Sequence, residues 1–376
     1  MNSVNSLKKK KEGFMKNEWV ALITDQHFGV RNNSQIFLDY YFKFYEETFF
    51  PTLKEYGIEE VIDLGDTFDK RKTVDFNMLD QVCDRYFDKL KEMEITIYSI
   101  VGNHTAYYKN TNRVNTLNLL LDKYDNIVIV ENPEVIRVNE NEDILLMPWI
   151  NEENQEQAFE LLKKKHKYCF GHLEINGFEM FAGQVHRDGE FEIDLFSNVE
   201  YVYSGHFHHR SKKGNVMYLG NPYQLTWGDY SDKRGFHLIN LETGELKFIE
   251  NPNQMFYRLT YDDSIENGRQ FTKENVKKYK DRFVKVLVKE KNSIAKFQRH
   301  MNNLFAAGPA DVIVLENELN FDTLEEEQDF DVNEEDTITL CKQSVIKYTQ
   351  ENNLNNGQDI EKMLVDLYQR VEREAA

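Results

Sequence analysis

The sequence has little cysteine and no long hydrophobic run. The 376-residue chain contains only three cysteines, Cys83, Cys169 and Cys341. They are odd in number and far apart, so they make neither a disulfide framework nor a thiolate metal site, and a reducing cytoplasm is the expected location. No segment approaches the ~18 consecutive apolar residues of a membrane span, and the N-terminus lacks the apolar stretch of a secretory signal. We therefore expect no membrane partner.

The chain also lacks an excess of positive charge. Its 46 Lys and Arg residues are outnumbered by 65 Asp and Glu residues, which gives a formal net charge of −19. Taken alone, this acidity argues against a DNA-binding protein, because duplex DNA attracts clustered Lys and Arg side chains. Hydrophobic residues make up 40% of the chain, including 20 Tyr and 26 Phe, which excludes a wholly disordered protein. The length indicates two domains, or one large domain with appendages.

Residues 18–253 alternate short apolar runs with longer helical patterns, after a basic tail of residues 1–17 that we expect to be disordered. In the first part, the patterns predict helices at 35–56, 74–91 and 114–122, and strands at 19–24, 60–64, 95–101 and 127–130. The later part is richer in predicted strands, at 144–147, 168–170, 201–203, 216–219, 236–240 and 246–250. Such alternation is typical of a layered α/β domain in which helices pack against buried sheets.

The composition changes twice beyond residue 253. Residues 267–300 hold eleven Lys or Arg and three Asp or Glu, a local charge of +8. Strand patterns at 283–288 and 312–315 and a helical pattern at 294–305 predict a small α+β domain over residues 254–318. Residues 316–336 carry eleven acidic side chains and no basic ones, so we interpret residues 319–337 as a solvated linker. Residues 338–376 include an amphipathic helical pattern.

Five short polar clusters stand out, and each follows an apolar strand pattern. They are Asp25-Gln26-His27, Gly65-Asp66-Thr67-Phe68-Asp69, Gly102-Asn103-His104, Gly171-His172 and Gly205-His206-Phe207-His208-His209. Open α/β sheets collect ligand groups at their strand ends. As alternate residues of an extended chain, Asp25 and His27 are expected to project to one side, as are His206 and His208, so that each pair can hold one ion. The glycines allow sharp turns and close approach.

These clusters supply a mixed set of metal ligands. The set comprises the carboxylates of Asp25 and Asp66, the imidazoles of His27, His172, His206 and His208, and the amide oxygen of Asn103. Mixed oxygen and nitrogen ligation suits manganese, iron or zinc. Because seven ligands are too many for one ion, we expect two divalent ions about 3.5–4 Å apart, with one bridging carboxylate and with open positions for water and a phosphoryl oxygen. The pattern predicts a hydrolase.

Any one of these histidines, taken alone, is more simply explained as a hydrogen-bonded core residue. The combination of four histidines and two aspartates at strand ends favours metal ligation instead. The other histidines do not share the pattern. His209 falls outside the alternation and His166, His186, His237 and His300 lie in no cluster, so all five are expected at the surface or in the core.

The order of the clusters, followed by Gly220-Asn221-Pro222, resembles that of the calcineurin-like metallophosphoesterases. Longer stretches are similar to the SbcD type of DNA double-strand-break nuclease, and most similar to its phage members, the recombination endonuclease subunits of T-even-like phages. These stretches are Asp25-Gln26-His27-Phe28-Gly29, Gly65–Asp69, Gly205–His208, Gly220-Asn221-Pro222-Tyr223-Gln224-Leu225 and Arg234-Gly235-Phe236. The resemblance covers about residues 18–250 and implies a four-layer αββα sandwich with a small α+β cap and a C-terminal helical segment.

The resemblance also implies roles for individual residues. One metal would be held by Asp25, His27, Asp66 and His208, and the other by Asp66, Asn103, His172 and His206. Both ions would be Mn²⁺, with Mg²⁺ as an alternative. His104 would face the substrate phosphate as general acid or transition-state stabiliser, with Asp69 and Arg71 as auxiliary residues near the site. The family usually has an acid after this histidine to orient it, whereas this chain has Thr105, so we expect His104 to be less basic or differently held.

The cap of such proteins contacts DNA beside the nuclease site. Candidate contacts here are Lys273, Lys277, Lys278, Lys280, Arg282 and Lys285, although a solvated basic face that balances the acidic linker is an equal alternative. Loop residues near the metal motifs could also hold phosphates, namely Arg31, Lys70, Arg71, Lys72, Lys109 and Arg113. The family works with an SMC-like coiled-coil ATPase, on which it docks through a C-terminal helical segment; the alternative here is a helix that packs on its own domain. Family members also dimerise through helices of the phosphoesterase domain, which implies a homodimer within a heterotetramer, in the host cytoplasm if the chain is phage-encoded.

Three functions compete. The favoured one is a two-metal DNA nuclease, an exonuclease on duplex ends and an endonuclease on single strands, within an SbcCD-like recombination and repair complex. The alternative is a small-molecule phosphomonoesterase or cyclic nucleotide phosphodiesterase of the same superfamily, which the acidity favours. A scaffold with a decayed site has only Thr105 to support it, since all seven inferred ligands are intact.

Overall fold

Residues 19–137, 143–181, 184–186, 189–264 and 271–316 are described by the structure, which is a computed structural model. The chain divides into two units, residues 1–317 and 318–376, and all described residues belong to the first. The predicted tail at 1–17, the linker at 319–337 and the helical segment at 338–376 lie outside the described residues. Within the described ranges, no helix is both long and apolar enough to cross a membrane.

The first six-stranded sheet has the order β16-β15-β1-β2-β3-β6. Its bounds are β1 Trp19–Ile23, β2 Glu60–Asp63, β3 Thr96–Ile100, β6 Ile127–Val130, β15 Gly235–Asn240 and β16 Leu246–Glu250. Strands β1, β2, β3 and β6 run parallel, whereas β15 is antiparallel to β1 and β16 antiparallel to β15. Every residue of β2 and β15 is buried, as in sheets that are covered on both faces.

The second six-stranded sheet has the order β13-β14-β12-β9-β8-β7. Its bounds are β7 Glu134–Arg137, β8 Asp143–Met147, β9 His166–His172, β12 Val199–Gly205, β13 Ser211–Lys213 and β14 Val216–Tyr218. Strands β8, β9, β12 and β14 are parallel, and the two edge strands are antiparallel to their neighbours. The second group of predicted strands is thereby divided between two sheets.

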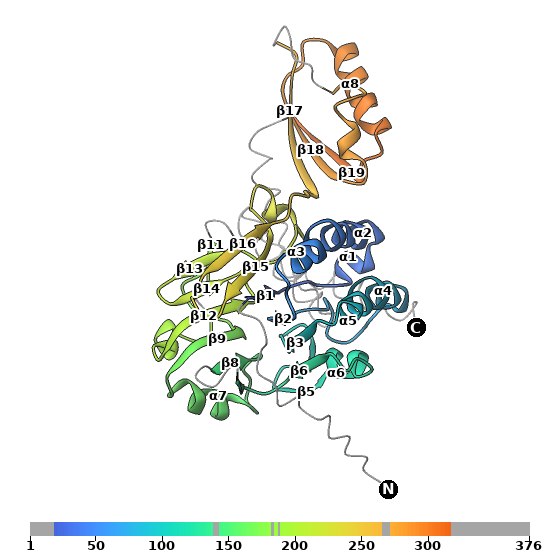
Figure 1. The fold of residues 1–376 in the computed structure, drawn as a ribbon. Coiled ribbons are helices and arrows are strands. Elements are labelled where there is room, and N and C mark those ends of the chain that lie inside the picture. The colour runs from blue at the N-terminus through green and yellow to red at the C-terminus, as the bar shows by residue number, and fades with distance from the viewer. Residues whose placement is uncertain (1–18, 138–142, 182–183, 187–188, 265–270, 317–376) are drawn as a thin grey trace, which may run out of the picture. The chain divides into compact units, whose positions relative to one another are not determined.

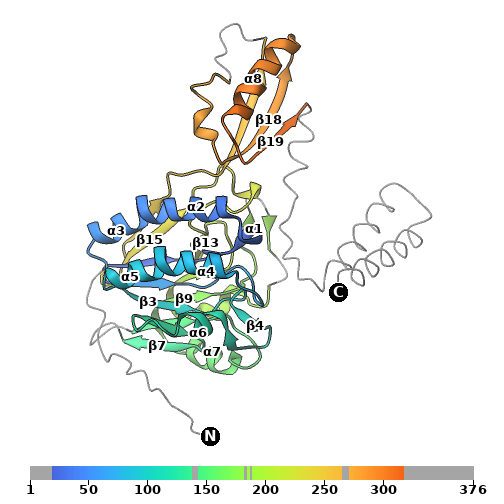
Figure 2. The same ribbon diagram turned by 90° about the vertical axis from the view of Figure 1, so that its right-hand side faces the viewer.

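Helices cover the outer face of each sheet, as Figures 1 and 2 show. Side chains of β1 alternate between two cores: Ala21 and Ile23 pack with the helices, and Val20 and Leu22 pack between the two sheets. A third core lies on the far side of the second sheet, under helix α7 (Gln155–Leu162). The order of layers is therefore helix, sheet, sheet, helix, which confirms the predicted four-layer sandwich.

The two long helices predicted at 35–56 and 74–91 are each interrupted by a π turn. The segments are α2 Gln35–Phe44, η1 Tyr45–Phe49, α3 Phe50–Glu55, α4 Phe76–Val82, η2 Cys83–Phe87 and α5 Asp88–Glu92. The interruptions meet, because the rings of Tyr45 and Tyr86 lie 4.7 Å apart between centroids. Helix α6 (Thr116–Leu121) begins later than predicted, after the cap residue Asn115, whose side chain accepts a hydrogen bond from Asn118 N.

Residues 256–315 form three parallel strands and one helix around a core of their own. The bounds are β17 Phe256–Asp262, β18 Phe283–Glu290, α8 Ile294–Ala306 and β19 Asp311–Leu315, and the short 3₁₀ turn η5 is Lys277–Tyr279. Ser293 caps α8 by accepting a hydrogen bond from Lys296 N. Strand β17 escaped prediction because half-exposed polar residues interrupt its apolar ones. We refer to residues 256–315 as the cap.

The remaining elements are short. They are α1 Val30–Asn33, β4 Ala106–Tyr108, β5 Thr111–Asn115, β10 Glu179–Phe181, β11 Gln184–Val185, η3 Ile193–Phe196 and η4 Trp227–Asp229. Strands β4 and β5 form a two-stranded ribbon that belongs to neither large sheet. This ribbon starts only two residues after His104, so it lies beside the polar strand ends.

Candidate metal centre

The polar clusters follow strands that are neighbours in the two sheets. The clusters at residues 25–27, 66–69 and 103–104 follow β1, β2 and β3, which are adjacent and parallel. His172 ends β9, and His206 comes directly after β12, its parallel neighbour. Because carboxyl ends of parallel strands share one edge of a sheet, these side chains are brought to the same region. We call Asp25, His27, Asp66, Asn103, His172, His206 and His208 the ligand cluster.

One half of the ligand cluster is formed by Asp25, His27 and His208. The Nε2 atoms of His27 and His208 lie 3.1 Å apart, and each is 4.0 Å from Asp25 Oδ1. Burial lowers the pKa of His208 well below its ordinary value, and the neighbouring His27 charge lowers it further. His208 is therefore neutral, which is the form of imidazole that binds metal ions.

The other half is formed by Asp66, Asn103, His172 and His206. His172 Nε2 lies 3.0 Å from Asp66 Oδ2 and 2.9 Å from Asn103 Oδ1. Asn103 Oδ1 is also 3.1 Å from His206 Nδ1. Burial and the charge of His172 lower the pKa of His206 well below its ordinary value, so this imidazole is neutral as well.

The donor set of the second half fits a cation. His172 Nδ1 donates to the carbonyl oxygen of Leu64 at 2.8 Å, so a neutral His172 directs the lone pair of Nε2 toward Asp66 Oδ2 and Asn103 Oδ1. Three lone-pair atoms that face one another require a positive charge between them. Burial opposes a positive charge on His172, but the carboxylate of Asp66 outweighs burial and raises the pKa of His172 to about 9.

The backbone that presents the ligands differs from the extended geometry expected from the sequence. Strand β1 ends at Ile23 and β12 at Gly205, and the ligands beyond them leave the strand conformation. Asp25, His27 and His206 have φ values of 50°, 46° and 90°. The prediction that alternate residues of one strand project together was therefore wrong in its reason for Asp25 and His27, and wrong in its result for His206 and His208, which fall into different halves of the ligand cluster. Asp25 and His27 reach the same place because left-handed turns aim them there.

His104 lies beside the ligand cluster, but Thr105 does not hold it. The ring centroids of His104 and His27 are 4.8 Å apart. His104 Nδ1 donates to the backbone carbonyl of Asp69 at 2.6 Å, and His104 N donates to Asp66 Oδ1 at 2.8 Å. Thr105 is buried and exchanges hydrogen bonds with the backbone of Gly102. The backbone carbonyl of Asp69, and not Thr105, therefore fixes the orientation of the His104 ring.

Asp69 also contacts the ligand cluster directly. Its Oδ1 lies 3.2 Å from His27 Nδ1. Burial lowers the pKa of His27, but the carboxylates of Asp69, Asp66 and Asp25 outweigh it and raise that pKa to about 9. The same contact keeps the pKa of Asp69 below its ordinary value despite burial. Asp69 therefore places its negative charge beside His27 and orients His104 with its carbonyl group.

A buried hydrogen-bond network behind the ligands was not anticipated. Gln26 Nε2 donates to Asp63 Oδ2 at 3.1 Å, and the hydroxyl of Tyr45 donates to Gln26 Oε1 at 2.5 Å. Tyr223 OH donates to the backbone oxygen of Gln26 at 2.6 Å. Burial raises the pKa of Asp63 to about 7, although hydrogen bonds from Thr67 and others oppose that rise. In the sequence, the one sign of this network was Asp63, an acidic residue at the end of an apolar strand.

Two further residues support the histidines from behind. The Trp149 ring lies 5.2 Å from that of His206 and 6.1 Å from that of His172. Arg234, from the Arg-Gly-Phe stretch, is 5% exposed and donates to the backbone oxygen of His208 and to Asn221 Oδ1. Its charge is balanced by Asp229 at 2.7 Å and Asp232 at 2.9 Å. The residues of the Gly-Asn-Pro and Arg-Gly-Phe stretches thus fix the His208 loop.

The histidines outside the pattern lie outside the ligand cluster. His209 contacts Asp232 and Glu179 at 2.8 and 3.4 Å, and His186 contacts Glu174 at 2.9 Å. His166, His237 and His300 are likewise absent from the candidate metal groups of the described residues. His237 is buried in β15, whereas His166 and His300 are half-buried.

The basic candidates differ in exposure. Lys273, Lys277, Lys278 and Lys280 are exposed on the cap, and Arg282 is half-exposed. Lys285, by contrast, is 1% exposed, and its Nζ lies over the Trp227 ring, 4.4 Å from the centroid. A side chain held in this way does not reach DNA, so the structure removes Lys285 from the candidate DNA contacts. Arg71 is half-buried, and its Nε is enclosed without a hydrogen-bond partner among the described residues.

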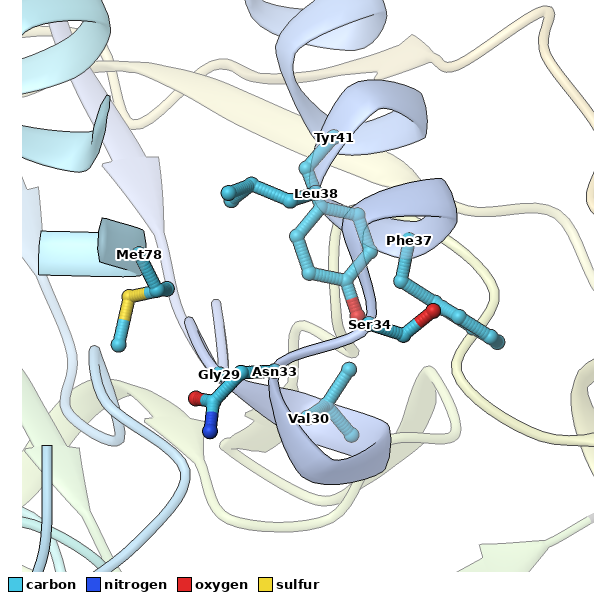
Figure 3. A pocket seen from close by; sticks show the side chains of 8 residues that line it. All are labelled: Gly29, Val30, Asn33, Ser34, Phe37, Leu38, Tyr41 and Met78. Carbon is cyan, nitrogen blue, oxygen red and sulfur yellow. The ribbon is translucent and has the colours of Figure 1, made fainter. Parts of the chain in front are cut away.

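A small pocket lies next to the turn that follows the first ligand motif (Figure 3). It is lined by Gly29, Val30, Asn33, Ser34, Phe37, Leu38, Tyr41 and Met78. No member of the ligand cluster lines it, and its walls are largely apolar. The pocket is therefore separate from the metal centre.

The two-sheet sandwich and the seven candidate metal ligands at its strand ends are the features expected of a metallophosphoesterase. The sequence profile of the calcineurin-like phosphoesterases matches residues 19–210, and the chain belongs to this family. This confirms the resemblance drawn from the motifs.

Among individual proteins, the chain is similar to exonuclease subunit 1 of Enterobacteria phage T4. The two are 35% identical over 209 residues, which are 55% of this chain and 60% of that protein. The chain thus spans less than two thirds of the relative. Two solved structures are also similar: a novel archaeal phosphodiesterase, with a TM-score of 0.32 and 13% identity over 62% of this chain and 99% of that chain, and the Pseudomonas putida nuclease MPE, with a TM-score of 0.28 and 14% identity over 60% and 85%.

Proposed function

We propose that this protein is a two-metal-dependent DNA nuclease, an exonuclease on duplex ends and an endonuclease on single strands. The observation that supports the proposal is the convergence of seven candidate ligands, from five strand ends, into two neighbouring groups beside His104. The likeness to a phage exonuclease subunit supports DNA as the substrate. That relative is named as a subunit. By analogy, this chain would be one subunit of a complex, which we propose to be an SbcCD-like recombination and repair complex.

In this proposal Asp25, His27, Asp66 and His208 hold one ion, and Asp66, Asn103, His172 and His206 hold the other. Asp66, whose Oδ2 lies 3.0 Å from His172 Nε2, would be the ligand shared by both ions, as the family resemblance implies. The mixed oxygen and nitrogen donors suit Mn²⁺, with Mg²⁺ as the alternative. When bound, two such ions polarise a phosphoryl oxygen and activate water.

We assign His104 the role of proton donor to the departing 3′ oxygen. Its Nδ1 is occupied by the Asp69 carbonyl, so the transferred proton comes from Nε2. The hydrogen bond fixes the ring plane, which a general acid needs for productive alignment. Asp69 is then a positioning residue, and Arg71, two residues further on, is a candidate phosphate contact.

DNA contacts on the cap are assigned to Lys273, Lys277, Lys278, Lys280 and Arg282. Four of these five side chains are exposed. They lie in residues 267–300, whose local charge of +8 contrasts with the net charge of −19 of the whole chain. The further partners are an SMC-like coiled-coil ATPase, which would dock on residues 338–376, and a second copy of this chain within a heterotetramer. The acidity of the whole chain favours a second candidate, a phosphomonoesterase or cyclic nucleotide phosphodiesterase with the same metal site.

Substrate choice separates these two candidates. The full chain with Mn²⁺ is offered labelled duplex DNA, single-stranded DNA and p-nitrophenyl phosphate, and degradation of DNA is the expected result. Turnover of the monoester without loss of DNA would contradict the nuclease proposal.

The metal assignment is tested by the substitution His206→Ala, which removes one nitrogen ligand from the second half of the cluster. We expect cleavage to fall by at least about 100-fold while DNA binding survives, since ligand loss removes the chemistry and leaves the basic cap intact. His166→Ala, at the start of β9, is the matched control and should cleave normally. Cleavage by the His206 variant at the normal rate would remove His206 from the metal site.

A further inference from the structure

Two adjacent tyrosines stand exposed on the β4–β5 ribbon that follows His104. We propose that Tyr107 and Tyr108 form a stacking site for unpaired bases, which holds a single strand, or the opened end of a duplex, next to the metal centre. This inference rests on the proposed nuclease function and extends it by naming the part of the substrate that the ribbon recognises.

Both rings are accessible. Ala106, at the start of β4, is buried, but Tyr107 is 40% exposed and Tyr108 51% exposed. Their ring centroids lie 4.7 Å apart in an edge-to-face arrangement. Because the two rings contact each other, they lie on the same side, and the irregular pairing at Tyr107 is what departs from the usual alternation of a strand. The pair therefore presents one continuous aromatic surface.

The ribbon is irregular where the tyrosines lie. Ala106 pairs with Asn115 and Tyr108 with Thr111, so Tyr107 alone on β4 faces three residues of β5. Such bulges re-aim side chains and are frequent beside active sites. The irregularity is a local feature of the segment that directly follows the Gly-Asn-His motif.

The ribbon is held near both of its ends. Asn112 Nδ2 donates to the backbone oxygens of Trp149 at 2.8 Å and Glu131 at 3.1 Å. Thr116 N donates to Thr105 O at 2.9 Å, which closes the other strand end. Because the Trp149 ring also packs against His206, the ribbon is connected to the metal centre at two points. A preformed support lowers the entropy that binding must overcome.

The tyrosines are within reach of the same DNA strand as His104. They follow His104 by three and four residues, so their Cα atoms are at most ~11 and ~14 Å from its Cα. Stacked nucleotides advance about 3.4 Å along each strand. A strand whose phosphate lies at the metal centre would therefore bring bases three or four nucleotides away to the ribbon.

The charge of the ribbon favours a nucleic acid over a protein partner. Residues 106–115 contain Lys109 and Arg113, both exposed, and no acidic residue, in a chain with a net charge of −19. Aromatic rings beside basic side chains are the combination that binds single-stranded nucleic acids without sequence preference, since every base offers a π face. Phosphates would contact Lys109 and Arg113 while the bases stack on the rings.

Binding of a labelled oligothymidylate to the full chain in EDTA, followed by fluorescence anisotropy, tests the proposal. The double substitution Tyr107→Ala and Tyr108→Ala should weaken binding by about tenfold or more, because stacking is lost. Replacing both tyrosines by Phe keeps the rings, so the affinity should stay within about twofold. Thermal unfolding checks that both variants are folded, and Leu119→Ala, at an exposed apolar residue of α6, is the matched control.

A strand with the same phosphates but abasic sites in place of bases isolates the stacking. Wild-type protein should bind it more weakly than oligothymidylate, whereas the alanine variant should bind both alike. Equal affinity of wild type and the alanine variant for oligothymidylate would overturn the inference. It would also be overturned if the alanine substitutions weakened binding of the abasic strand as much as binding of oligothymidylate. Failure of the proposed nuclease function would give a different result, because wild-type protein with Mn²⁺ would then leave single-stranded DNA uncut whatever its affinity for the strand.

Discussion

At the scale of single residues, the metal centre depends on glycines as much as on ligands. An added Cβ at Gly102 would overlap Asp66 Oδ1 and its backbone nitrogen, and one at Gly205 would overlap Thr24 Oγ1. Gly65, with φ +107°, would place a Cβ 2.5 Å from His172 Nδ1. The ligand loops pack so closely that several of the predicted glycines leave room for a neighbouring ligand, in addition to letting the chain turn.

The substitution Gly102→Ala should therefore weaken metal binding by about 10–100-fold, because the methyl group displaces Asp66. Isothermal titration of the full chain with Mn²⁺ measures the loss. Gly57→Ala is the matched control: its φ of +61° is also left-handed, but nothing lies within 4 Å of the added Cβ. That variant should lose some stability and keep its metal affinity. Equal metal affinity of the Gly102 variant and wild type would show that the Asp66 loop adapts.

At the scale of elements, strand β15 is buried on both faces although it contains a histidine. His237 faces the inter-sheet side, 5.1 Å from the Phe248 ring on β16. Its two ring nitrogens have no hydrogen-bond partner among the described residues. Burial, together with the charge of Arg210, lowers the pKa of His237 to about 3. Folding therefore keeps this imidazole neutral, whereas the unfolded chain protonates it below about pH 6.5.

This difference makes the sandwich sensitive to acid. The stability linked to a depressed histidine pKa is complete above pH 6.5 and is lost as the pH falls toward 3, so about 2 kcal/mol should disappear between pH 7 and 5. The substitution His237→Leu should make the loss of unfolding free energy between pH 7 and pH 5 smaller by this amount. Urea unfolding of both proteins at pH 7 and pH 5 measures it, with His166→Leu as control. A variant that loses as much stability as wild type on acidification would contradict the assignment.

At the scale of the whole molecule, the centre and the cap belong to one unit, residues 1–317, and the C-terminal residues belong to another. All seven ligands come from residues 25–208, upstream of the boundary. Metal binding and chemistry should thus be independent of the segment that we propose for docking the ATPase.

Deleting residues 338–376 should leave Mn²⁺-dependent DNA cleavage within about twofold of wild type and abolish association with the ATPase. Co-purification of tagged protein with the ATPase measures the association, and cleavage by the same preparation is the internal control. A truncated chain that still binds the ATPase would move the docking site into residues 1–337.

Much of the centre was predictable because its chemistry is local in sequence. Each ligand follows an apolar strand, so the pattern of strands and polar ends was enough to predict that Asp66 and His172 lie at the edge of their sheets. The left-handed turns at Asp25 and His206 were not predictable in this way. They depend on backbone contacts with distant loops, such as the hydrogen bond from Asp25 N to Gly65 O at 2.9 Å.

Residues that act through packing were harder to predict. Gln26, Asp63 and Trp149 have no spacing that distinguishes them, and their roles follow only from which segments become neighbours. Lys285 shows the opposite case, since its charge predicted a surface position. It lies on the central strand of the three-stranded sheet, where the Trp227 ring packs over its ammonium group. Charge alone does not determine exposure when an aromatic ring replaces water.

The division of the ligands between the two sheets has a consequence for biosynthesis. The first sheet contributes Asp25, Asp66 and Asn103, and the second contributes His172 and His206. A chain emerging from the ribosome cannot assemble this centre before residue 208 has been synthesised and the halves have docked. If the proposed metal site carries the activity, unfinished or half-folded copies would be inert, and metal binding would indicate that both halves have folded.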